Sequence, residues 1–257
     1  EPIARLPLPP QLIIPLHQHI GGTPRPLVKV GDRVLHGQRI GAADGNVSSA
    51  VHAPTSGHVV AIEPRLMPHA SGLSSMAVVI EPDGQDQRIE REPFDWHAAT
   101  PGEVRDYLRD AGVVGLGGAV FPSHLKLSPG KAGGTDTLVL NGAECEPFIT
   151  CDDMLMRSEA EDILRGALVM QKMLAAKQVL VGVEDNKPEA AAALKAAAAA
   201  LGHASLDVVV VPTRYPAGGA KQLIRVLTGI EVPHGSRSTD FGVQCFNVAT
   251  ALAVWRA

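Results

Sequence analysis

Two patterns of hydrophobic residues divide the chain near residue 100. Between residues 27 and 82, apolar residues recur at short spacing between turn-forming residues, as in Val30–Gly41 and Ala53–Ile62. This pattern is typical of short β-strands joined by tight turns. Residues 1–26 are interrupted by prolines and suit an extended surface arm rather than a helix. We therefore predict an arm over residues 1–26 and a small β domain over residues 27–99.

From residue 100 onward, long apolar runs alternate with helical segments. Thr100, Pro101 and Glu103 supply an N-cap, a proline in the first turn and a capping-box glutamate. The predicted helices cover residues 100–111, 153–176, 188–202 and 247–255, and the predicted strands cover residues 137–141, 178–184 and 206–211. Each strand is a continuous apolar run, which is typical of a parallel sheet buried on both faces. Residues 100–257 therefore predict an α/β domain with a parallel sheet.

Composition limits the class of protein. The chain has 257 residues, of which 45% are hydrophobic, and this is enough for a packed core in one or two domains. Its 23 basic and 27 acidic residues give a formal net charge of −4, so we expect no nucleic-acid partner. No stretch reaches the ~18–20 apolar residues that a membrane helix needs, and no signal-peptide pattern is present. We expect a soluble chain without a direct membrane span.

The ends and the potential metal ligands give further expectations. The chain lacks an initiator Met, and its last predicted helix has no stop signal, so we expect both ends to be cut from a longer protein. Cys145, Cys151 and Cys245 form no Cys-x-x-Cys pair, and an iron–sulfur cubane usually needs four thiolates. We expect no metal site among them. His17 and His19 share the spacing of a metal pair but lack a nearby acidic or thiol partner, which favours a polar loop.

The turn-rich segment over residues 27–99 resembles the lipoyl/biotinyl carrier fold, a flattened barrel of two intertwined halves. Carriers attach their cofactor to a lysine at the tip of a hairpin. No lysine occurs between Lys29 and Lys126. We therefore expect a barrel-sandwich hybrid domain without an attachment lysine, and a function as acyl or carboxyl carrier is excluded.

Three loops of the second half carry candidate chemistry. Gly115–Lys126 combines three glycines with a lysine, which suits backbone contacts to a phosphate or a simple glycine-rich turn. Asn141–Pro147 follows a predicted strand, where open sheets bind ligands. Its carboxylates could bond a heterocycle and a ribose, or they could cap the following helix. Tyr215–Gln222 follows another strand and opens a helix, so it could hold an anion.

These loops, together with the runs Cys151–Asp153, Glu184–Pro188 and Val232–Gly235, resemble the C subunit of the Rnf/Rsx electron-transport complex. The resemblance covers essentially the whole chain, and that family is similar to the NADH-oxidising flavoprotein subunit of respiratory complex I. It implies a Rossmann-like domain that binds FMN and oxidises NADH, with [4Fe-4S] clusters in a C-terminal segment absent here. It also implies a peripheral, NADH-linked flavin oxidoreductase subunit of an ion-translocating complex on the cytoplasmic face of the bacterial inner membrane. The implied partners are the other subunits and a redox protein such as ferredoxin.

The resemblance also implies residue roles. FMN contacts are implied for Gly115, Gly117, Gly118, Lys126, Asn141, Glu144 and Asn247, and contacts with the substrate NADH are implied for Glu146 and Phe121. No catalytic side chain is implied, because hydride transfer takes place on the flavin itself.

Five residues depart from the complex I pattern and motivate a second hypothesis. Ala143, Cys145, the pair Gly219–Ala220, and Phe246 each stand where that pattern has a more polar residue. Each change removes a polar contact. The alternative function is therefore a non-catalytic scaffold subunit that keeps the fold without bound flavin, since a fold does not imply a function.

Overall fold

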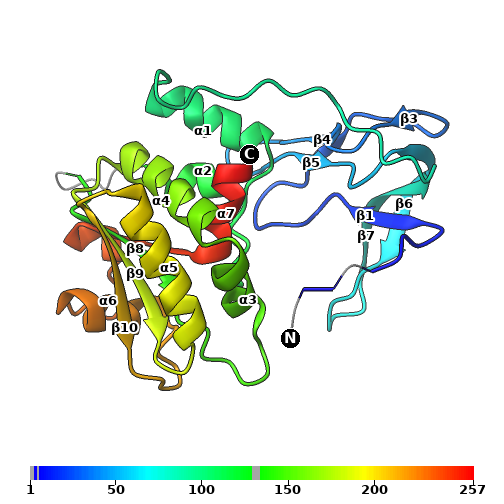
Figure 1. Ribbon diagram of the computed structural model, residues 1–257. Helices are drawn as coiled ribbons and strands as arrows, with labels where there is room; N and C mark the ends of the chain where they lie inside the picture. Colours follow the sequence, from blue (N-terminus) through cyan, green and yellow to red (C-terminus); the bar gives the residue numbers. More distant parts are fainter. Residues whose placement is uncertain (1–2, 5, 129–133) are drawn as a thin grey trace. The chain divides into compact units, whose positions relative to one another are not determined.

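The computed structural model describes residues 3–4, 6–128 and 134–257, which fall into two compact units (Figure 1). The N-terminal unit comprises Ala4–Val114 and Ala119–Lys126, and the C-terminal unit comprises Leu127–Ala257 and the loop Gly115–Gly118. The boundary therefore lies beyond the predicted one at residue 100. Within the described part of the chain, no helix has the length and apolar character needed to cross a membrane.

The N-terminal unit contains two small sheets. A four-stranded sheet has the order β1-β7-β6-β3, and a three-stranded sheet has the order β2-β4-β5. The strands are β1 (Leu12–Pro15), β2 (Arg25–Pro26), β3 (Arg33–Val34), β4 (Arg39–Ala42), β5 (Val51–His52), β6 (Gly57–Leu66) and β7 (Ser74–Pro82). Their inward side chains form one core that includes Leu16, Val34, Ile40, Val59 and Ile80. Short strands around a single core agree with the predicted small β domain.

The predicted N-terminal arm is corrected by the pairing of two strands. β1 pairs antiparallel with β7, so that Leu12 lies opposite Ile80, and β2 pairs with β4. Leu16, directly after β1, is 1% exposed in the barrel core. This stretch is therefore part of the barrel, because its apolar side chains bury against a strand more than 60 residues away in the sequence.

The first helix, α1 (Pro101–Asp110), begins as the sequence predicts but belongs to the N-terminal unit. Thr100 Oγ1 accepts a hydrogen bond from the Glu103 backbone N–H, and Glu103 Oε2 accepts one from the Thr100 N–H at 2.8 Å, which completes the capping box. Gly112, at φ +75°, follows the helix, and a side chain there would meet the carbonyl of Ala50. The short helix α2 (Ser123–Lys126) follows in the same unit.

The C-terminal unit is built on a four-stranded parallel sheet. Its strands are β8 (Thr137–Gly142), β9 (Gln178–Glu184), β10 (Leu206–Val211) and β11 (Val243–Asn247), in the order β10-β9-β8-β11. All three pairings are parallel. The predicted strands and the parallel α/β architecture are confirmed, whereas β11 was not predicted.

Helices cover both faces of this sheet (Figure 1). They are α3 (Cys151–Ser158), α4 (Ala160–Leu174), α5 (Pro188–Leu201), α6 (Ala220–Thr228) and α7 (Val248–Arg256), with a 3-10 turn η1 (Ser238–Phe241). A Cβ at Gly182 would meet Leu223 of α6, whereas a Cβ at Gly142 would meet Met156 of α3. Asn141 is paired with Gly182, so Gly142 points to the other face. α3 and α6 therefore lie on opposite faces.

The predicted helix over residues 153–176 is two helices. The chain breaks at Glu159, whose backbone (φ −128°, ψ 26°) leaves the helical region. Just before the break, the Ser158 hydroxyl donates to the Met154 carbonyl, and such side-chain bonds compete with regular helix geometry. Both helices are amphipathic and both contact the sheet. Because the spacing of apolar residues is helical on both sides of Glu159, the sequence pattern does not indicate the break.

Candidate functional site

The site lies at the carboxyl edge of the C-terminal sheet, directly after β8. Asn141, the fifth residue of β8, donates from Nδ2 to the Gly218 carbonyl at 2.7 Å, and its Oδ1 accepts from the Ala143 N–H at 3.0 Å. The Gly218 N–H in turn donates to Cys145 Sγ, and a side chain at Gly218 would collide with the Ala143 carbonyl. Asn141 therefore fastens the loop after β8 to the Tyr215–Gln222 loop.

Glu144 caps helix α3. Its Oε1 accepts from the Asp152 N–H at 3.0 Å and from the Cys151 thiol, and its Oε2 accepts from the Asp153 N–H at 3.1 Å. A carboxylate at a helix N-terminus satisfies otherwise unpaired N–H groups and opposes the helix dipole. Of the two glutamates in this loop, Glu144 takes the capping role and is 7% exposed, while Glu146 is exposed.

Asp152 connects this cap to the last strand. Asn247 Nδ2 donates to Asp152 Oδ2 at 2.5 Å, while Asn247 Oδ1 accepts from the N–H groups of Ala249 and Thr250 and so caps α7. Burial raises the pKa of Asp152 to about 6, and the nearby carboxylates of Glu144 and Glu146 add to the rise, although the Asn247 hydrogen bond opposes it. The predicted flavin residue Asn247 is thus tied to the acidic loop.

A buried ion pair closes the other side of the loop. Lys187 Nζ lies 3.0 Å from Glu184 Oε2 and donates to the Glu144 carbonyl at 2.8 Å. Glu184 is fully buried, and its Oε1 accepts no hydrogen bond. These contacts link the carboxyl end of β9 to the carboxyl end of β8. The sequence could have indicated Glu184, because it ends an apolar run at the sheet edge.

A cavity of about 300 Å³ borders this loop. Glu146, Phe148, Glu184, Asn186 and Lys187 are among the residues that line it. Phe148 has a φ of +67° and is fully exposed, a combination that is unfavourable for an L-residue. The cavity therefore combines acidic groups, one lysine, one amide and an exposed aromatic ring.

The glycine-rich loop Gly115–Gly118 approaches the same region of the C-terminal unit. The Leu116 N–H donates to the buried Thr250 hydroxyl at 2.9 Å. A Cβ at Gly117 would lie 3.0 Å from Asn247 Cβ, and Gly118 has a φ of +103° with open space where a side chain would stand. The loop therefore packs its backbone against Asn247 and leaves room beside Gly118.

The structure brings Glu144, Cys151 and Asp152 close enough for their donor atoms to lie within 4.8 Å of one another. Hydrogen bonds join these side chains to the rest of the unit, because Glu144 accepts from two backbone N–H groups and the thiol, and Asp152 Oδ2 accepts from Asn247. These hydrogen bonds account for the close approach of the three side chains. His17 and His19 likewise bond Thr23 and backbone groups.

A family model described as the Nuo51 FMN-binding domain matches residues 108–256, more than half of the chain. The chain belongs to the Nuo51 FMN-binding domain family. A second family model, described as the RnfC barrel sandwich hybrid domain, matches residues 1–85 ahead of the Nuo51-type domain. Both kinds of domain were predicted from the sequence, and the resemblance on which that prediction rested is confirmed.

Three bacterial proteins that share one name are similar to the chain over nearly its whole length. The C subunit of the ion-translocating oxidoreductase complex of Edwardsiella ictaluri is 49% identical over 100% of the chain and 32% of the relative. The corresponding protein of Pseudomonas aeruginosa is 50% identical over 98% of the chain and 32% of the relative, and that of Serratia proteamaculans is 48% identical over 100% and 36%. The chain spans about a third of the length of these curated relatives.

Solved structures support the fold of the Nuo51-type domain. An NAD⁺-reducing [NiFe]-hydrogenase in the H2-reduced state matches 62% of this chain and 31% of its own, with a TM-score of 0.52 and 24% identity. The air-oxidised state of such a hydrogenase gives a TM-score of 0.53 at the same identity, over 63% of this chain and 30% of its own. At this identity the likeness shows the fold alone.

The residues predicted for the flavin and NADH divide between the two units. The N-terminal unit contains Phe121 and Lys126. The C-terminal unit contains the others, which are Gly115, Gly117, Gly118, Asn141, Glu144, Glu146 and Asn247. Asn247 joins the glycine loop to Asp152, and Asp152 joins it to the Glu144 cap. Sequence reasoning did not find Asp152, Thr250 or the pair Lys187–Glu184 as parts of this network.

Proposed function

We propose that the C-terminal unit binds FMN and exchanges electrons between NADH and iron–sulfur carriers, within a peripheral subunit of an ion-translocating electron-transport complex. Family membership over residues 108–256 is the observation that carries this proposal. When bound, FMN supplies the chemistry, because it accepts a hydride and releases electrons singly. The other subunits, a redox protein such as ferredoxin and a place at the cytoplasmic face of the inner membrane belong to the same proposal.

The residues of the C-terminal unit fit such a cofactor. A backbone can approach a ligand closely only where side chains are missing, and Gly118 has open space where its Cβ would stand. The loop around it is held by the Leu116–Thr250 hydrogen bond. Backbone N–H groups of a glycine-rich loop suit the phosphate of a flavin nucleotide. Lys126 belongs to the N-terminal unit, and a positive charge from it to the flavin phosphate stays a prediction from the family resemblance.

The polar side chains at the sheet edge position this loop system. Both ends of the Asn141 amide and both oxygens of Glu144 are engaged in hydrogen bonds within the unit. They hold the backbone of residues 141–145 in place, so that this backbone can line the isoalloxazine ring. We propose that Asn141, Glu144 and Asn247 act mainly by positioning, with their remaining lone pairs available to the cofactor.

Glu146 is proposed to bind the nicotinamide nucleotide. Unlike Glu144, it is exposed and borders the cavity of about 300 Å³. A carboxylate in that position can accept hydrogen bonds from ribose hydroxyls. Phe121 belongs to the N-terminal unit, and its contact with NADH stays a prediction from the family resemblance.

Titration of the apo-chain with FMN tests the first half of the proposal, with flavin fluorescence as the readout. Gly118→Ala places a methyl group in the open space and is expected to weaken FMN binding about tenfold or more. Gly134→Ala is the matched control, because Gly134 has a similar φ of +107° and equally open surroundings within the same unit. Equal losses in both variants would show backbone strain, and not occlusion of a flavin site.

Anaerobic titration of the FMN-loaded chain with NADH tests the second half. Glu146→Gln is expected to raise the NADH concentration needed to bleach the flavin, while the spectrum of the oxidised flavin stays unchanged. Failure of NADH to reduce bound flavin in the unsubstituted chain would contradict electron exchange but would leave FMN binding intact.

The second candidate function is a scaffold subunit without flavin. It is favoured by the burial of Ala143 and Phe246, which are 4% exposed and offer no polar side-chain group at the sheet edge. This function predicts no change in FMN fluorescence on addition of the chain, at any concentration that fully titrates a known flavoprotein.

A further inference from the structure

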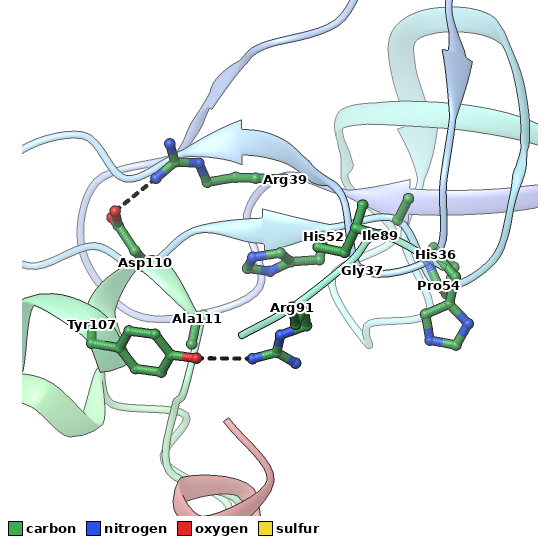
Figure 2. A pocket seen from close by; sticks show the side chains of 11 residues that line it. His36, Gly37, Arg39, His52, Pro54, Ile89, Arg91, Tyr107, Asp110 and Ala111 are labelled. Carbon is green, nitrogen blue, oxygen red and sulfur yellow. Dashed lines mark hydrogen bonds and ion pairs between the residues drawn. The ribbon is translucent and has the colours of Figure 1, made fainter. Parts of the chain in front are cut away.

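The N-terminal unit contains a cavity of about 620 Å³ that lies outside the proposed flavin site (Figure 2). Its polar wall brings together residues that are far apart in the sequence: His36, Arg39 on β4, His52 on β5, Arg91, and Tyr107 and Asp110 on α1. All of them belong to the same compact unit. Cavities of about 300–1,000 Å³ are the usual size for small-molecule ligands.

The charged groups of this cavity are mainly basic. Arg39 and Arg91 face it, and Asp110 is the one acidic side chain among the described residues that line it. Arg39 Nη1 lies 2.8 Å from Asp110 Oδ2, and both side chains are about half exposed. A guanidinium carries five N–H donors, so this ion pair leaves Arg39 able to bind a second oxyanion.

The positions of the arginines are held by neighbouring groups. Arg91 Nη2 donates to the Tyr107 hydroxyl at 3.2 Å, and the Tyr107 ring stacks on Phe94 with centroids 4.3 Å apart. Figure 2 shows the His52 ring between the two arginines. Because Tyr107 is itself fixed by stacking, the Arg91 guanidinium is oriented before any ligand enters, which lowers the entropic cost of binding.

Both arginines affect the pKa of His52. Burial lowers its pKa, and the positive charges of Arg39 and Arg91 lower it further, although a backbone hydrogen bond at Asp110 and the Asp110 carboxylate oppose the shift. These are the charged groups that face His52 from β4, from α1 and from the segment after β7. An anion between the arginines would offset their positive charges and would therefore raise the pKa of the imidazole, which can donate a hydrogen bond to the anion.

The remaining wall is apolar. Ile89, Pro54 and Ala53 line it, and the glycine at position 37, with a φ of +81°, keeps a side chain out of the space beside Ile89. An inorganic anion alone would leave this surface unused. A ligand with an oxyanion at one end and an apolar or planar body at the other would contact both walls.

We propose that this cavity, the Arg39–Arg91 pocket, binds a small organic phosphate, with the phosphate between Arg39, Arg91 and His52 and the organic body against Ile89 and Pro54. A phosphate monoester is favoured over a carboxylate because it carries a charge of about −1.5 to −2 and three acceptor oxygens at pH 7. It thus matches two guanidinium groups and an imidazole. A carboxylate offers only two oxygens and one charge.

Binding of phenyl phosphate to the 257-residue chain tests the proposal, with inorganic phosphate and benzoate as comparison probes. NMR of the His52 ring reports occupancy of this pocket, because His52 lines it between the two arginines. Phenyl phosphate is expected to shift the His52 resonances saturably and to raise the His52 pKa. Inorganic phosphate and benzoate are each expected to bind at least about fivefold more weakly.

The variants Arg39→Gln and Arg91→Gln are expected to weaken phenyl phosphate binding about tenfold each. Arg88→Gln is the matched control, because Arg88 precedes Arg91 by three residues, is exposed and does not line the cavity. It removes the same charge and should change affinity less than about twofold.

Three outcomes would overturn the proposal. The first is no saturable His52 shift with phenyl phosphate up to about 10 mM, which corresponds to negligible affinity. The second is an equal loss in Arg88→Gln and Arg39→Gln, which would show general charge attraction. The third is stronger binding of benzoate than of phenyl phosphate, which would assign the pocket to carboxylates.

Discussion

The two polar regions of this protein differ in how their charged groups are used. At the sheet edge of the C-terminal unit, Glu144, Asp152 and Asn247 bond one another and the ends of helices α3 and α7. In the N-terminal unit, Arg39 and Arg91 border a cavity of about 620 Å³. The polar atoms of the first region hold a loop system together, whereas the second region places its charged side chains around a cavity.

This difference sets the expected consequences of mutation. A buried hydrogen bond that loses one partner leaves the other unsatisfied, which costs more than the bond itself contributed. A half-exposed ion pair contributes little, because water and salt screen it. Substitutions at the sheet edge should therefore change the free energy of unfolding, and substitutions in the Arg39–Arg91 pocket should change ligand binding alone.

The largest effect is expected for Glu144→Ala. The substitution leaves the N–H groups of Asp152 and Asp153 without their acceptor at the start of α3. We expect a loss of about 2–3 kcal/mol in the free energy of unfolding, measured by urea denaturation. Glu146→Ala is the control and should cost less than about 0.5 kcal/mol, because Glu146 is exposed. Similar losses in both variants would contradict the capping role.

Asp152→Asn should stabilise the protein at neutral pH. The pKa of Asp152 is raised from 3.8 to about 6 in the folded state, so the folded protein holds this proton more tightly than the unfolded chain does. The group therefore contributes its full stability below about pH 4 and loses it as the pH rises to about 6.

At pH 7 the charged Asp152 is a cost that an amide avoids, and we expect a gain of about 1–2 kcal/mol after allowing for partial exposure. Urea denaturation of both proteins between about pH 4 and pH 7 measures this. The difference should vanish at the acidic end of the range. A constant difference across the range would show that the effect does not come from titration of Asp152.

The fold could be predicted where the chain's local pattern decides the structure. The apolar runs Leu138–Leu140 and Val208–Val211 are typical of a parallel sheet, and both are strands of it. The first is buried on both faces, whereas the second is an edge strand on which Val210 is 42% exposed. The pairing of β1 with β7 could not be predicted, because it joins Leu12 to Ile80 and depends on the register of a whole sheet. The break at Glu159 is likewise a backbone event inside an unbroken amphipathic pattern.

The site could be predicted in part for the same reason. Asn141 at the end of a buried strand and Glu144 just after it indicate the sheet edge, and the structure places them there. The path of the loop decides whether Glu144 or Glu146 caps α3, and the sequence does not predict that path. The Arg39–Arg91 pocket was missed because its residues come from two short strands, a loop and a helix, which are widely separated in the sequence.

Phe148→Gly is expected to stabilise the C-terminal unit slightly, in contrast to the loss expected for Glu144→Ala. Phe148 has a φ of +67° and a fully exposed ring, so its side chain contributes strain without burial. Glycine adopts this backbone freely, and the relief should exceed its entropic cost by about 0.5 kcal/mol. Thermal denaturation measures the gain, with Phe148→Ala as the control that removes the ring but keeps the Cβ. A loss of stability in the glycine variant would mean that the ring is buried by a contact in solution.

The smallest effect on stability is expected for Arg39→Gln, and this prediction tests the comparison from the other side. The Arg39–Asp110 ion pair is half exposed, so its loss should change the free energy of unfolding by less than about 0.5 kcal/mol. The same substitution removes a positive charge that lowers the pKa of His52, and the pKa should therefore rise toward 6.5. NMR titration of the His52 ring, with Arg88→Gln as the control, measures the shift. Unchanged stability together with a raised His52 pKa would show that the charge of Arg39 affects the groups lining the cavity but does not stabilise the fold. A loss of stability comparable with that of Glu144→Ala would mean that the basic region, like the acidic one, is part of the framework.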